Sequence, residues 1–138
     1  MARDPVTCHV LNTLSGTPGA GLRATLTLLA GPDTIQTPLQ YTATTDADGR
    51  VANWTPLGHD ASVSGVLSAL PTPDSETIWS VRFEVGPWYK AQGVKTFFPE
   101  VDVKFTVEGR GREGQEGWRH YHVPVLLSPW SYTTYRGS

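Results

Sequence analysis

Apolar and polar residues alternate along much of the chain, and this alternation is typical of half-buried strands. It is clearest at 22–29, 77–85 and 101–107, where nearly every second residue is apolar and most of the residues between are polar or charged. Shorter or less regular runs with Val, Ile, Thr and Tyr predict further strands. These lie at 7–13, 40–45, 50–54, 123–127 and 131–135. The pattern therefore predicts about eight strands.

Turn-forming residues separate these strands and leave little room for helices. The chain of 138 residues has 14 Gly and 11 Pro, and only 17% of it is charged. One short helix is predicted at 87–93, because Pro87 stands early and Gly93 ends it. Short alternating strands joined by Gly and Pro turns favour an all-β fold, a two-sheet antiparallel β-sandwich.

The length predicts a single domain over residues 1–138. The segment at about 55–75 interrupts the strand pattern, and we expect it to be an insertion, with a helical turn at 64–70 and His59 on the surface. The segment 108–117 contains four glycines among charges and is expected to be a loop. No strand and helix flank it in the arrangement that binds phosphate, so we do not assign it a phosphate site.

Composition excludes several classes of partner. The net charge of −2 gives no reason to expect a nucleic acid or an anionic membrane. No apolar run approaches the roughly 18 residues of a membrane span, and the N-terminus has no secretory apolar core. The single cysteine, Cys8, cannot form an internal disulfide, which fits a reducing compartment. Cytosol is the default expectation, with the peroxisome as the alternative.

Several polar residues leave the core face of their strands. Successive side chains of a strand point to opposite faces, so His9 points away if its neighbours Cys8 and Val10 enter the core. By the same rule His120 and His122 share one face. For His9 on its own, a solvated surface position is the common explanation.

Four motifs of this chain resemble the hydroxyisourate hydrolase branch of the transthyretin-like family. They are His-Tyr-His-Val-Pro-Val-Leu-Leu-Ser-Pro at 120–129, Tyr-Arg-Gly-Ser at 135–138, Asp-Gly-Arg at 48–50 and Phe-Phe-Pro-Glu at 97–100. The family's His-Val-Leu matches residues 9–11 as well, but Asn12 follows it where Asp is usual, and Val125 stands where Leu is usual.

The resemblance implies a fold, an assembly and an activity. Members have two four-stranded sheets and form homotetramers, as dimers of dimers with sites in the channel between dimers. The hydrolases open the lactam of 5-hydroxyisourate with water, need no cofactor, and give 2-oxo-4-hydroxy-4-carboxy-5-ureidoimidazoline. When the family's motifs are matched to this sequence, the resemblance implies that His9, Arg50 and His122 are the catalytic residues. The substrate-binding residues are Tyr135, Arg136, Gly137 and Ser138.

The chemistry needs a base for water and a stabiliser for the developing oxyanion. Histidine suits the base and arginine the stabiliser. Whether His9 or His122 is the base stays open in the sequence. A metal site is not expected, because Cys8 and His9 point apart and no carboxylate is spaced to complete one. Ser138 is a poor nucleophile, since it lies at a flexible end.

Two functions compete with hydrolysis. The first is a non-enzymatic small-molecule carrier of the transthyretin type. Carriers lack the set of His9, Arg50 and His122 and the Tyr-Arg-Gly-Ser end. The second is an interaction module of the immunoglobulin type, for which the chain offers no cysteine pair.

Overall fold

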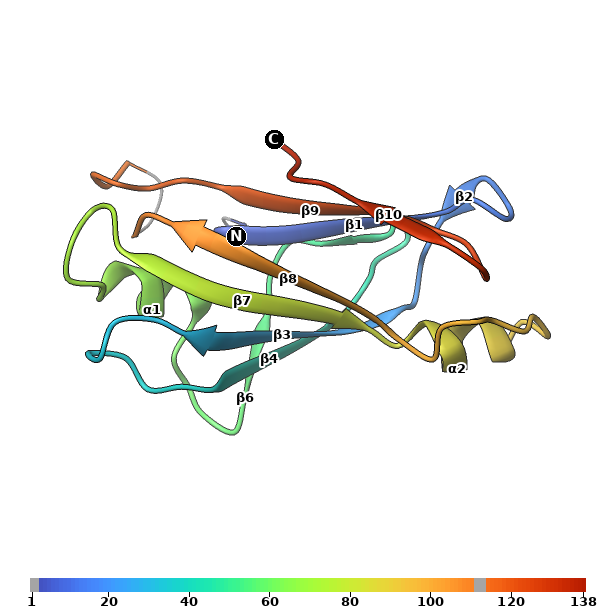
Figure 1. The fold of residues 1–138 in the computed structure, drawn as a ribbon, viewed down its shortest axis with the longest axis horizontal. Helices are drawn as coiled ribbons and strands as arrows, with labels where there is room; N and C mark the ends of the chain where they lie inside the picture. The colour runs from blue at the N-terminus through green and yellow to red at the C-terminus, as the bar shows by residue number, and fades with distance from the viewer. Residues whose placement is uncertain (1–2, 111–113) are drawn as a thin grey trace.

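The computed structural model of the chain describes residues 3–110 and 114–138 as a sandwich of two sheets (Figure 1). Residues 1–2 of the predicted domain and 111–113 of the loop predicted at 108–117 lie outside the described residues. The elements in chain order are β1 (Val6–Asn12), β2 (Thr17–Pro18), β3 (Arg23–Ala30), β4 (Leu39–Thr44), β5 (Arg50–Val51), β6 (Thr55–Leu57), α1 (Val63–Ser68), β7 (Glu76–Phe83), α2 (Val85–Lys90), β8 (Val101–Glu108), β9 (Tyr121–Leu127) and β10 (Tyr132–Thr134).

The first sheet has the order β10-β9-β1-β2, with β5 also pairing with β1, and the second has the order β6-β4-β3-β7-β8. The predicted sandwich is therefore confirmed. The described residues form ten strands rather than about eight, because β2 and β6 are too short to show alternation. β1 and β9 pair in parallel, whereas the sequence pattern predicted antiparallel strands throughout.

Alternate residues of the strands form the core between the sheets, as the pattern predicted. In β1 the side chains of Val6, Cys8 and Val10 are buried there, and in β7 Trp79 and Val81 are. Burying a side chain of this size stabilises the fold by about 1.5–3 kcal/mol. The opposite face of β1 and β9 is thus free to carry polar residues.

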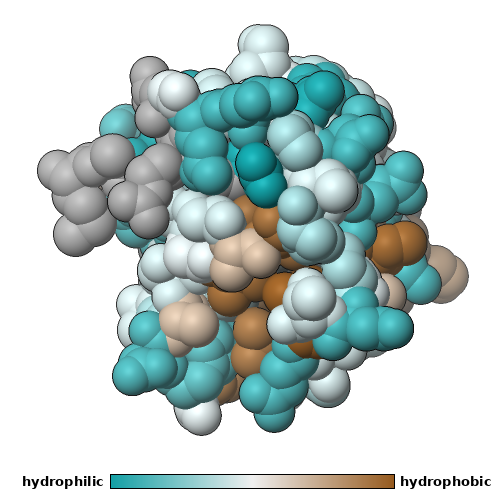
Figure 2. Space-filling view, turned by 90° about the vertical axis from the view of Figure 1, so that its left-hand side faces the viewer, coloured by the Kyte–Doolittle hydropathy of each residue, from teal (hydrophilic) through white to brown (hydrophobic). Residues whose placement is uncertain are grey.

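The segment predicted as an insertion contains β6 and α1. The hydroxyl of Ser62 accepts a hydrogen bond from the Gly65 N–H at 2.9 Å and so caps α1, which buries Val63, Val66 and Leu67. α1 therefore realises the helical turn expected at 64–70. Figure 2 shows this end of the sandwich, where apolar side chains appear between polar ones.

His59 lies in the same segment and is half-buried rather than on the surface. Its ring meets the ring of buried Tyr41 edge to face at 5.0 Å, and its Nε2 donates to the Gln40 carbonyl at 3.0 Å. This packing against β4 has no local signature in the sequence. That the segment is an insertion stays a prediction.

The second short helix, α2, closes the opposite end of the sandwich (Figure 1). It begins two residues before the predicted start at Pro87, and Gly93 follows it with φ +74. The Tyr89 hydroxyl donates to Asn12 Oδ1 at 2.7 Å, so Asn12 ties the end of β1 to α2. In the described part of the chain, no helix is long and apolar enough to cross a membrane.

Candidate active site

The candidate site lies on the outer face of the first sheet, where β1 runs between β9 and β5. Opposite residues of paired strands point to the same face. His9 lies opposite Arg50 of β5, and Thr7 lies opposite His122 of β9. The pairing therefore brings together the three residues that the motifs predicted as catalytic, His9, Arg50 and His122, from three separate strands.

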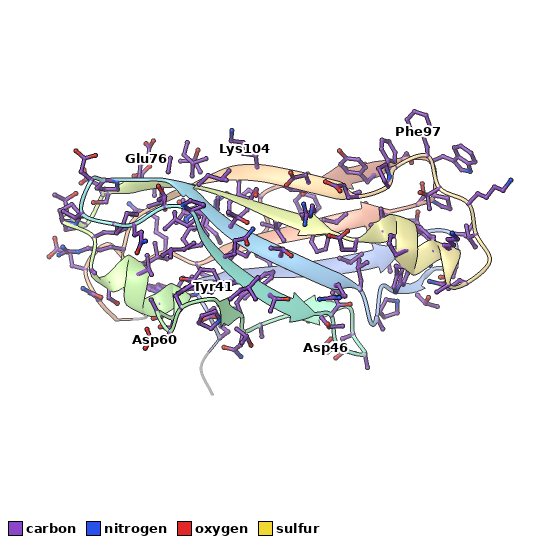
Figure 3. All side chains as sticks on the ribbon, turned by 90° about the horizontal axis from the view of Figure 1, so that it is seen from below. Tyr41, Asp46, Asp60, Glu76, Phe97 and Lys104 are labelled. Atoms are coloured by element: carbon purple, nitrogen blue, oxygen red, sulfur yellow. The ribbon has the colours of Figure 1, made fainter. Side chains whose placement is uncertain are left out.

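A hydrogen-bonded turn places Arg50. The carboxylate of Asp46 accepts hydrogen bonds from the N–H groups of Asp48 at 2.9 Å and of Arg50 at 3.0 Å. Gly49 has φ +77, and a Cβ there would collide with the carbonyl oxygen of Val10. Only glycine therefore fits this close approach to β1. Figure 3 shows Asp46 in this turn, beyond the end of β4.

His9 and His122, the two histidines predicted as catalytic, lie near each other. Their ring centroids are 6.5 Å apart. His9 Nε2 is 2.9 Å from the Asp48 carbonyl oxygen, which can only accept, so this nitrogen carries the proton and donates. Nδ1 of His122 is 2.7 Å from the Thr7 hydroxyl. The Nε2 atom of His122 is therefore the ring nitrogen left for a water or a substrate.

An open cleft of about 170 Å³ lies beside His122. Its lining residues are Arg3, Thr7, Cys8, Arg50, Val51, Ala52, His122 and Ser138. Arg3 and Arg50 give it two guanidinium groups, which suit an oxygen-rich or anionic ligand. His9 lies next to this cleft rather than in its lining.

The environment of His122 keeps its ring neutral. Burial lowers the pKa of His122 below its ordinary value, and the nearby charges of Arg50, His9 and Arg3 lower it further. A neutral imidazole has a lone pair to accept a proton, so this arrangement favours a base. Cys8 differs: burial raises the pKa of its thiol to about 12, which keeps the sulfur protonated.

The C-terminal tetrapeptide divides between two places. The Gly137 N–H donates to the His122 carbonyl at 2.8 Å, and Ser138 lines the cleft. Tyr135 and Arg136 line a second groove of about 270 Å³, which runs along β8 and β9 and which His122 also lines. His122 therefore borders both hollows, with Ser138 in the cleft and with Tyr135 and Arg136 in the groove.

Arg136 is held outside the cleft by three contacts. Its guanidinium lies 4.5 Å from the centre of the Tyr121 ring, and its N–H groups donate to the Gly137 carbonyl at 2.9 Å and the His120 carbonyl at 3.4 Å. A cation over an aromatic face is worth about 0.5–1 kcal/mol at exposed sites. Arg136 therefore anchors the tail on β9.

Two lining residues were missed by the sequence interpretation. Thr7 shares the outward face of β1 with His9, so the period of two pointed to it, but its neighbour His122 depends on the β1–β9 register. Arg3 precedes β1, and no local pattern marks it. Within residues 3–110 and 114–138, no cluster of three or more His, Cys, Asp or Glu could hold a metal ion.

Comparison with known proteins identifies the family of the chain. The family model described as HIUase/Transthyretin family matches residues 6–137. A probable 5-hydroxyisourate hydrolase of Schizosaccharomyces pombe is 37% identical over 133 residues, covering 96% of this chain and 90% of the relative. The 5-hydroxyisourate hydrolase of Mus musculus is 37% identical over 135 residues, covering 98% and 96%.

A solved structure gives the same result for the fold. The 5-hydroxyisourate hydrolase of Klebsiella pneumoniae superposes with a TM-score of 0.62 at 26% identity, covering 96% of this chain and 98% of that one. The family model spans nearly the whole chain, and both relatives exceed 30% identity over almost their full length. The chain therefore belongs to the HIUase/Transthyretin family.

Proposed function

We propose that this chain hydrolyses 5-hydroxyisourate to 2-oxo-4-hydroxy-4-carboxy-5-ureidoimidazoline, a step of urate degradation. The observation that carries the proposal is the convergence of His9, Arg50 and His122 beside one cleft. A lactam hydrolase needs a base and a cationic donor side by side, and this face supplies both. The relatives described above are named for the same activity.

In the proposed mechanism His122 is the general base. Its Nε2 takes a proton from a water molecule as the water oxygen attacks the lactam carbonyl. Arg50 donates N–H bonds to the carbonyl oxygen, which gains negative charge as the tetrahedral intermediate forms. When the C–N bond breaks, the departing ring nitrogen receives the proton from the His122 imidazolium. No cofactor takes part in this scheme.

His9 is proposed to orient the substrate or the water. Its Nε2–H is held by the Asp48 carbonyl at 2.9 Å, so its Nδ1 is the nitrogen that can accept a hydrogen bond. The same bond fixes the plane of the ring. This assignment separates the two histidines, which the sequence left interchangeable.

The tail is proposed to complete the binding site. Ser138 lines the cleft and can contact the substrate directly. Gly137, Arg136 and Tyr135 were all expected to bind substrate. We propose that Gly137 and Arg136 act by holding Ser138 beside His122, and that Tyr135 contacts the substrate from the groove that it lines together with His122.

The proposed assembly is a homotetramer, with sites between dimers. Aromatic side chains support it: Phe97 is 68% exposed and Trp130 is 67% exposed, and their rings lie 6.5 Å apart. Large exposed apolar groups that cluster mark interaction surfaces. β8 and β10 also end their sheets, so each offers an edge for a second chain. A cytosolic location stays a prediction.

The test is the decay of freshly made 5-hydroxyisourate, generated by urate oxidase and followed in the ultraviolet. The protein should accelerate this decay, and His122→Gln should abolish most of the acceleration. His59→Gln is the matched control. It makes the same change at a histidine that follows β6 of the second sheet, away from the cleft. Decay at the spontaneous rate with folded wild-type protein would reject hydrolysis and favour the carrier.

A further inference from the structure

The hydroxyl of Thr7 lies between two histidines. Its Oγ1 is 2.7 Å from His122 Nδ1 and 3.1 Å from His120 Nε2. Thr7 is only 6% exposed, so the hydroxyl meets these rings with little access of bulk water. The β1–β9 register, which sets Thr7 opposite His122, fixes this arrangement in the backbone.

A threonine hydroxyl has one proton to donate, so it cannot donate to both rings. In one arrangement Thr7 donates to His122 Nδ1, and neutral His122 then carries its proton on Nε2, the ring nitrogen that Thr7 does not contact. In the other arrangement His122 donates its Nδ1–H to Thr7, and Thr7 donates to His120 Nε2. Only the second arrangement leaves a lone pair on His122 Nε2.

The charges of the cleft favour the second arrangement. Arg3 and Arg50 line it together with His122. The unprotonated nitrogen is the negative end of the imidazole dipole, and side-chain dipoles orient in the field of nearby charges. The two guanidinium groups therefore stabilise the ring with its lone pair, rather than its N–H, on the cleft side.

Stacking holds His120 where Thr7 can reach it. The His120 ring lies between the rings of Trp118, at 6.4 Å and 20°, and His122, at 6.3 Å and 21°. The three rings are nearly parallel, which restricts rotation of the His120 side chain. Its Nε2 is thereby kept within hydrogen-bond distance of the Thr7 hydroxyl.

We propose that Thr7 is a positioning residue that, together with His120, holds neutral His122 in the tautomer protonated on Nδ1. The consequence for catalysis rests on the proposed function, since it makes Nε2 the base. The assignment of the tautomer does not depend on the proposed function. The partner of a histidine on its second nitrogen sets which tautomer is present, and loss of such a partner at metal-bound histidines lowers metal affinity or activity about 10–100-fold.

The direct experiment is a long-range ¹H–¹⁵N spectrum of the folded protein at neutral pH, with the His122 signals assigned from His122→Gln. We expect wild-type His122 to show a protonated Nδ1 and an unprotonated Nε2. In Thr7→Val, which keeps the shape and removes the hydroxyl, signal should move toward the form protonated on Nε2. Thr7→Ser should restore the wild-type spectrum.

The kinetic arm uses the same variants. We expect kcat of Thr7→Val to fall about tenfold or more, with KM changed less than about twofold, because the change acts on the base rather than on binding. Thr7→Ser should recover most of kcat. The control is Thr13→Val, which removes a hydroxyl bonded to the Leu127 carbonyl at the far end of the same strand pair.

Each outcome decides the proposal. A wild-type His122 protonated on Nε2, or an unchanged spectrum and kcat in Thr7→Val, overturns it. If Thr7→Val does not fold, His120→Phe replaces it, because a phenyl ring keeps the stack and removes the acceptor. It should shift His122 in the same direction. A protein without hydrolase activity still gives the spectrum, so failure of the proposed function is distinguished from failure of the tautomer.

Discussion

The backbone N–H of Gly137 donates to the carbonyl oxygen of His122 at 2.8 Å, so the end of the chain is bound to the strand that carries the proposed base. The fit is close. A Cβ added at Gly137 would lie 2.8 Å from Cδ2 of His122 and 2.9 Å from Cγ of Pro124. Neither atom belongs to the end of a long flexible side chain, so the tail or the imidazole has to move.

Gly137→Ala is therefore expected to reduce hydrolysis while leaving the fold intact. Displacing a catalytic ring by about 1 Å can cost about 100-fold in rate, and we expect a loss of about tenfold or more in kcat/KM. The measurement is steady-state decay of 5-hydroxyisourate together with thermal unfolding. Gly65→Ala is the control, since a Cβ there meets only the Ser62 hydroxyl, at 3.0 Å. Equal kinetics in the two variants would mean that the tail does not hold the ring.

The lowered pKa of His122 predicts how activity depends on pH. The base form is the neutral ring, so kcat/KM should be constant above the lowered pKa and fall as the pH drops through it. The charge of Arg50 is one cause of the lowering, after burial. Arg50→Gln should therefore raise the pKa of His122, which an NMR titration of its ring protons would detect even if turnover is lost. A pKa that stays in place would exclude Arg50 as a cause.

The same group links pH to stability. The pKa of His122 in the folded protein lies below the ordinary value of 6.5. At a pH between these two pKa values, His122 is protonated in the unfolded chain and unprotonated in the folded protein. The free energy of unfolding should therefore decrease as the pH falls through this window, and the penalty is complete below the folded pKa. Urea unfolding of wild type and His122→Gln between pH 7 and 5 measures it. The variant should lose less stability than the wild type over this range.

Alternation and motif together predicted most of the fold and half of the candidate site. Eight of the ten strands follow from alternation or from short runs rich in strand-forming residues, and His9, Arg50 and His122 follow from the motifs that contain them. Strand pairing is not local. β1 pairs with β9 in parallel, and this pairing places Thr7 opposite His122. It depends on contacts between segments at opposite ends of the chain. Arg3 has no periodic neighbour and could be placed only by the folded structure.

Cys8 is expected to be inert although it lies beside the cleft. It is 1% exposed, and burial raises the pKa of its thiol to about 12. The thiolate is the reactive form, so at pH 8 almost none is present. Iodoacetamide should leave native protein unmodified by mass spectrometry and fully active, and it should label the chain in urea. Rapid labelling of the native protein would show that β1 separates from β5 under these conditions.

The proposed tetramer predicts that the exposed aromatic residues matter for assembly. Phe97 projects outward from the loop after α2 (Figure 3), and its N–H donates to the Pro129 carbonyl at 2.8 Å, which joins this loop to the turn that bears Trp130. An aromatic side chain in the centre of an interface commonly contributes about 2 kcal/mol or more to binding.

Trp130→Ser and Phe97→Ser should thus shift the mass in light scattering from tetramer toward smaller species at micromolar concentration. The matched control is Leu57→Ser, because Leu57 is 53% exposed on β6 at the opposite edge of the second sheet. Its removal should leave the mass unchanged. A wild-type protein that is monomeric at these concentrations would reject the tetramer. It would also require each site to be complete within one chain.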